Sequence, residues 1–172
     1  MFDPTIFDNL KVAFENELYD LDNLDRIIDI TGRKDVLDMA VMSREFSVSF
    51  RLAGSGDGVT AELVLDTSLR DLSAEILGLQ GEKAACSLVI LFHTEVEADG
   101  LETRCREIER CIADIWMPEK VPVQTLSRVF GENSERYRNR VELRFSRRIG
   151  EEQMEDIPEL IEHAVRTLAA LA

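Results

Sequence analysis

The side chains best suited to chemistry follow the longest apolar run of the sequence. His93, Glu95 and Glu97 alternate with other residues there, so they share one face if the run continues as a β-strand. Imidazole and carboxylate groups are ligands for Zn, Mn or Fe. Successive side chains on one face of a strand are about 6.6–6.8 Å apart, which is too wide for three of them to hold one ion. A metal site here would need further ligands, and a strand that becomes polar as it leaves the core explains the pattern equally well.

A second candidate site is a row of arginines between residues 128 and 148, where the sequence has seven Arg and three Glu. Guanidinium groups bind phosphates and carboxylates through two parallel hydrogen bonds. We predict that Arg140, Arg144 and Arg148 are binding residues. If the strand that carries them begins early, its arginines share one face: Arg136, Arg138, Arg140, Arg144 and Arg148.

Three occupants fit this arginine row. It could meet an acidic face of the same chain, of a second copy or of a partner protein. It could follow a nucleic-acid backbone, although few aromatic residues are interleaved with it and Tyr137 points the other way. The simplest alternative is a solvated sheet face whose arginines pair with nearby Glu side chains.

The apolar run itself, residues 84–92 with the sequence AACSLVILF, is the stretch around which the fold should be built. It contains no charge and is rich in branched side chains. Such a run is typical of a strand that is buried on both faces.

Composition limits the class of protein. A chain of 172 residues, 45% of them hydrophobic, predicts one globular domain spanning residues 1–172. The net charge of −14 opposes nucleic-acid binding by the molecule as a whole. No apolar run approaches 18 residues, and the first ten residues lack the features of a signal peptide, so we expect no membrane span and a cytoplasmic location. The three cysteines form no C-x-x-C pair and are expected to be reduced packing residues; we predict no cofactor.

The first half of the chain predicts a helix, a meander of strands and a short helix. Residues 24–31 fit either a helix or a strand, and residues 32–35 (GRKD) are typical of a turn. Two alternating runs follow, at residues 36–42 and 45–53, but their apolar residues change from odd to even positions. We therefore expect a tight turn or a bulge at Ser43-Arg44. The glycine-rich residues 54–58 lead from one strand to another, which indicates a hairpin rather than a phosphate-binding loop.

The second half predicts strands alternating with two helices. After the apolar run, residues 99–117 have the apolar spacing of an amphipathic helix that ends at Pro118. An extended segment lies within residues 121–130, and residues 137–149 predict a strand with Val141, Leu143 and Phe145 facing inward. The last helix begins near Asp156, with Pro158 in its first turn.

These elements predict an α+β fold, a mainly antiparallel sheet packed by about four helices. The opening order α-β-β-β-α-β resembles that of restriction-like nuclease cores and of small acidic secretion-chaperone folds. A restriction-like nuclease needs an acid on one strand and Glu-x-Lys on the next to hold a metal and orient water. Here Val64 occupies the lysine position after Glu62, and Glu142-Leu-Arg144 is only a loose substitute, so at most an inactive relative is expected.

We therefore expect a non-enzymatic protein-interaction or dimerisation module, whose partner is a second copy or another protein. Two other functions stay open. One is a metal-dependent hydrolase with a site near His93, Glu95 and Glu97. The other is a nucleic-acid accessory protein that uses the row from Arg136 to Arg148.

Overall fold

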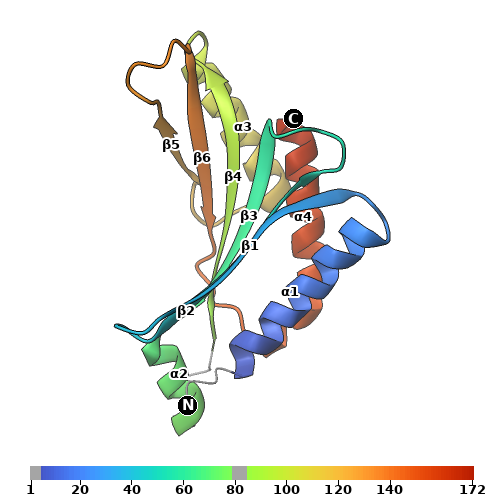
Figure 1. Cartoon of the computed structure of the whole chain (residues 1–172), viewed down its shortest axis with the longest axis vertical. Helices are drawn as coiled ribbons and strands as arrows, with labels where there is room; N and C mark the ends of the chain where they lie inside the picture. Colours follow the sequence, from blue (N-terminus) through green and yellow to red (C-terminus); the bar gives the residue numbers. More distant parts are fainter. Residues whose placement is uncertain (1–4, 79–84) are drawn as a thin grey trace.

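The protein is a single α+β domain, in agreement with the prediction from sequence. Our computed structural model describes residues 5–78 and 85–172 (Figure 1). The described elements, in chain order, are α1 (Thr5–Asn23), β1 (Ile28–Asp38), β2 (Ser43–Leu52), β3 (Val59–Thr67), α2 (Leu69–Leu77), β4 (Ser87–Glu97), α3 (Leu101–Trp116), β5 (Val123–Ser127), β6 (Arg136–Arg144), a 3₁₀ helix (Glu151–Asp156) and α4 (Ile157–Leu171).

The six strands form one antiparallel sheet in the order β1-β2-β3-β4-β6-β5. Helices α1, α3 and α4 pack together on one face of the sheet, and α2 lies at one end (Figure 1). Among the described residues, no helix covers the opposite face, which we call the open face. Antiparallel sheets commonly have one packed and one solvated face. None of the described helices has the length and apolar character needed to span a membrane.

The apolar run forms the central strand β4 from Ser87 onward, as expected, whereas Cys86 just before it makes an isolated bridge to Ile149. Leu88, Ile90 and Phe92 belong to the core between the sheet and the helices. Val89 and Leu91 point to the open face and are still only 7% and 5% exposed. The prediction of a strand buried on both faces is confirmed for these five residues, whereas Ala84 lies outside the described residues.

The meander differs from the prediction because its first strand is longer. Residues 32–35, expected to be a turn, are in the middle of β1 and pair with β2. The prediction was wrong because these residues are polar, which is typical of a turn, whereas here their charges are paired with residues of another element. Arg33 forms an ion pair with Glu15 of α1, and Asp35 with Lys11 of the same helix.

The change of apolar parity between residues 36–42 and 45–53 occurs at a hairpin turn, as predicted, and β1 contains a separate bulge. The register of β1 against β2 shifts between Ile30 and Gly32. An extra residue reverses the facing of every side chain after it, so the odd-numbered Arg33 and Asp35, opposite Val48 and Phe46, follow Ile28 and Ile30 on the face that the helices cover. The turn itself comes earlier than expected, at residues 39–42, and Met42 adopts a φ of 53° there.

We expect Asp35 to contribute to stability in a pH-dependent way. The hydrogen bond from Arg44 lowers the pKa of Asp35 to about 2, because it favours the ionised carboxylate. Asp35→Asn should therefore lower the free energy of unfolding at pH 7 by about 1 kcal/mol, given that the pair is partly solvated. The difference should shrink as the pH falls from about 4 to about 2, where the native carboxylate is protonated. Urea unfolding of both proteins across that range checks this, and a difference that persists at pH 2 would contradict it.

Candidate functional site

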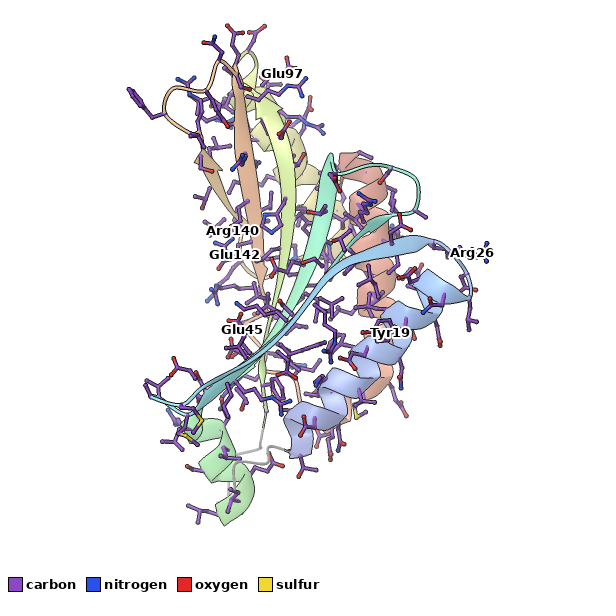
Figure 2. The ribbon with its side chains drawn as sticks, viewed as in Figure 1. Tyr19, Arg26, Glu45, Glu97, Arg140 and Glu142 are labelled. Carbon is purple, nitrogen blue, oxygen red and sulfur yellow. The ribbon has the colours of Figure 1, made fainter. Side chains whose placement is uncertain are left out.

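The predicted arginine row lies on the open face, on strand β6. Arg136, Arg138, Arg140 and Arg144 alternate with side chains that face the helices, of which Val141 and Leu143 are fully buried. Strand alternation thus turns these four guanidinium groups toward solvent. Figure 2 labels Arg140 beside Glu142 on this strand.

Carboxylates of the same chain balance most of this charge. The register of β4 against β6 places Glu97 opposite Arg136, Glu95 opposite Arg138 and His93 opposite Arg140. The Arg136 guanidinium lies 3.3 Å from Glu95 Oε2 and 3.4 Å from Glu97 Oε1. These cross-strand pairs fit a solvated sheet face.

Glu142 balances two further members of the row. Its carboxylate lies 3.3 Å from the Arg140 guanidinium and also accepts a hydrogen bond from Arg144. Arg138 is the member that has no ion pair with any residue the structure describes. The arginine row therefore contains positive and negative side chains in contact, and it is not a continuous positive surface.

Arg148 does not belong to the row, although the sequence predicted that it would share the face. Strand β6 ends at Arg144, and the chain then bends so that Arg148 reaches Asp71 in the first turn of α2. Burial raises the pKa of Asp71, but the hydrogen bonds from Arg148 and from Ser68 outweigh it and leave the pKa below its usual value. Arg148 thus anchors α2 to the sheet.

The structure places His93, Glu95 and Glu97 on one face of β4, as predicted, but each has other partners. His93 Nε2 lies 3.3 Å from Glu62 Oε2, and this hydrogen bond lowers the pKa of Glu62. Glu95 and Glu97 hold Arg136, as described above. Within residues 5–78 and 85–172, no three His, Cys, Asp or Glu side chains converge as metal ligands would. Val64, in the position where a nuclease would need lysine, follows Glu62 on the same strand.

Two open hollows lie where β4 and β6 extend beyond the start of β3. One, of about 320 Å³, is lined by His93, Glu95, Arg138 and Arg140 among others. The other, of about 380 Å³, contains Glu95, Glu97 and Arg136 beside the apolar side chains of Leu52 and Leu168. Because each hollow mixes acidic and basic groups, neither selects a ligand of one charge.

Strand β5 presents a feature that sequence reasoning did not identify as a site, an unpaired edge of the sheet (Figure 1). Its five residues, VQTLS, carry no charge. One side pairs with β6, and the backbone groups on the other side bond to no residue that the structure describes. Four exposed apolar residues lie in β5 or within three residues of it: Val121, Val123, Val129 and Phe130.

The other edge of the sheet, β1, is protected. Charged residues and a bulge interrupt it, and Asp22 of α1 accepts a hydrogen bond from the edge amide of Ile30 at 3.2 Å. Lys11 and Glu15 of the same helix hold side chains of β1. Natural sheets use such devices to prevent strand addition. The sheet therefore has one protected edge and one accessible edge.

A second exposed apolar surface lies at the opposite end of the molecule. Met39 and Val41 in the β1–β2 turn are exposed, as are Ile76 and Leu77 of α2. Residues 79–84, which follow α2, are outside the described part of the chain. This surface is therefore left without an assigned role.

The accessible edge had a signal in the sequence. Residues 121–127 (VPVQTLS) form an uncharged extended segment in a chain of which 31% is charged. What the sequence could not show is that this segment is at the margin of the sheet. Comparisons with protein-family models, curated proteins and solved structures found no match, so the geometry alone guides the functional inference.

Proposed function

We propose that this protein is a non-enzymatic protein-interaction module that binds by strand addition at β5. The observation that carries this proposal is the contrast between the two sheet edges, since β1 is charged, bulged and covered by α1 whereas β5 is uncharged and uncovered. An added strand gains main-chain hydrogen bonds from the edge and side-chain contacts from the residues that flank it.

The exposed apolar residues beside β5 favour the same proposal. Phe130 is fully solvent-exposed, and Val121 and Val123 are more than half exposed. Aromatic side chains that enter a partner's surface contribute strongly to binding. Exposed apolar groups gathered around an open strand edge therefore provide both parts of an interface.

Of the predicted binding residues, Arg140 is the one best placed to take part. It pairs with Thr125 of β5 in the sheet register, so its guanidinium lies one strand from the edge. Arg144 has no partner position on β5, and Arg148 is engaged at α2. We therefore keep Arg140 as a residue at the rim of the proposed interface.

The cytoplasmic location remains part of the proposal. All three cysteines are unpaired, as in a reducing compartment. Burial raises the pKa of the Cys86 thiol to about 12, which makes this cysteine a packing residue rather than a nucleophile.

The substitution Thr125→Lys tests the proposal. Thr125 is exposed at the centre of β5, so the change should leave the fold intact while placing a charge on the edge. We expect the affinity of self-association, or of binding to a co-purified protein, to fall about tenfold or more. Sedimentation velocity from low to high micromolar concentration, with native mass spectrometry of the purified protein, measures this.

Thr125→Val is the matched control, because valine keeps the strand propensity and adds no charge. It should associate at least as strongly as the native protein. If the native protein remains a bare monomer at every concentration, or if the Lys and Val variants associate equally, β5 is not an interaction edge.

A further inference from the structure

We infer that the partner of β5 is β5 of a second copy, paired antiparallel about a two-fold axis at Thr125. This inference rests on the proposed function and specifies its partner. Thr125 is the middle residue of Val123–Ser127, so an axis there pairs the whole strand with itself. The two sheets then become one sheet of twelve strands.

The strand is complementary to itself in this register. The axis places Val123 opposite Ser127 of the second copy, Gln124 opposite Leu126 and Thr125 opposite Thr125. No charged side chain opposes a like charge, and Thr–Thr pairs are favourable across antiparallel strands. A two-fold interface requires this self-complementarity, because each contact occurs twice.

The residues that flank the strand also match. Antiparallel pairing brings the apolar residues before β5, such as Val121, to those after β5 of the second copy, Val129 and Phe130. All three are exposed in the single chain, and each contact between them would remove apolar surface from water. In the same register, Lys120 lies near the residues that follow β5 in the second copy, which include Glu132. In a parallel arrangement the two Phe130 side chains would instead meet each other, as would the two Lys120 side chains.

The net charge of the molecule and the length of β5 determine how tightly the dimer is expected to associate. A chain of net charge −14 repels a second copy, but the residues within β5 are uncharged and Arg138 and Arg140 lie on the neighbouring strand. Five residues at an edge bury less than a standard interface, so a reversible dimer with a Kd in the micromolar range or weaker is expected. Salt should strengthen it by screening the overall repulsion.

Disulfide formation at the axis tests the register. In the full-length protein, Thr125→Cys would bring two cysteines within about 4.5–5.5 Å between Cα atoms, inside the range that a disulfide accepts. In a glutathione redox buffer it should form a covalent dimer at least tenfold faster than the native protein, which controls for Cys105 and Cys111. Non-reducing electrophoresis over time measures the rate.

Ser127→Cys is the matched control, since Ser127 is exposed on the same strand face. In the inferred register the two copies of residue 127 are about 14 Å apart along the strands, too far for a disulfide. Ser127→Cys alone should therefore not cross-link, but its mixture with Val123→Cys should give the mixed dimer.

Three results would overturn the inference. The first is equal cross-linking of the residue 125 and residue 127 variants, which indicates parallel strands. The second is a protein that sediments as a dimer but shows no preference for cross-linking at residue 125. The third is a native protein that is bound to a different chain. In the last case a loss of binding in Thr125→Lys would leave the proposed function intact while self-pairing fails. If Thr125→Lys changes no association at all, the proposed function fails as well.

Discussion

Replacing Phe92 by Ala should lower the free energy of unfolding by about 3–5 kcal/mol, the range measured for large-to-small aromatic substitutions in a core. Phe92 is fully buried in the central strand, between Ala61 of β3 and Val141 of β6. The packed helices on that face cannot close around the space because α1, α3 and α4 also contact one another or other strands. Denaturant unfolding measures the loss, with the midpoint falling at an unchanged slope.

Phe130→Ala is the matched control for this prediction. The residue types are identical, but Phe130 is fully exposed, so its removal should change the stability of the monomer by less than about 0.5 kcal/mol. Measurements at submicromolar concentration keep association from contributing. Equal losses from the two substitutions would mean that β4 is not in the core.

Asp71→Asn should lower the free energy of unfolding at pH 7 by about 1–3 kcal/mol, because it replaces the charged acceptor of Arg148. The Asp71 side chain is only 7% exposed, so solvent cannot replace the lost interaction. Helix α2 should loosen most, since Ile76 and Leu77 at its end are exposed and Arg148 ties its first turn to the sheet. Faster hydrogen exchange of the α2 amides would show this.

The pH dependence has a defined sign. The pKa of Asp71 is lowered in the folded protein, so its contribution is complete above the unfolded pKa of about 4 and is lost as the pH falls below it. Native protein and variant should therefore converge in strong acid. A stability difference independent of pH would contradict this account, because the hydrogen bonds from Arg148 and from Ser68 both favour the ionised carboxylate.

Asp66 provides a comparison of opposite sign. Burial raises the pKa of Asp66, and the nearby carboxylates of Asp71 and Glu45 act in the same direction. A raised folded pKa means that the charge is unfavourable in the native state, so Asp66→Asn should increase stability at pH 7. The increase should vanish in acid, where the native Asp66 is protonated. Destabilisation by Asp66→Asn at pH 7 would contradict this account.

The sequence by itself determined the α+β class, the four main helices and the central strand. Local patterns carried these predictions: the uncharged run ending at Phe92 can only be stable where both faces are covered, and the helical spacing in residues 99–117 requires one buried side. The alternation around Val141 likewise fixed the facing of Arg140 and Arg144.

Tertiary structure decided what depends on distant partners. Residues 32–35 look like a turn because they are polar, yet they form a strand because β2 pairs with them and α1 supplies the opposite charges. Arg148 has the strand periodicity of the row, but the bend after Arg144 takes it to a carboxylate 77 residues away.

The accessible edge was decided in the same way. Residues 123–127 are a plausible strand from sequence, but the order β4-β6-β5 makes that strand the margin of the sheet. Strand order depends on which strands pair with one another although they are far apart in the sequence. The local pattern of hydrophobic residues does not predict it. The local sequence therefore indicated that residues 123–127 could form a strand, and the strand order decided that one edge of β5 has no neighbouring strand.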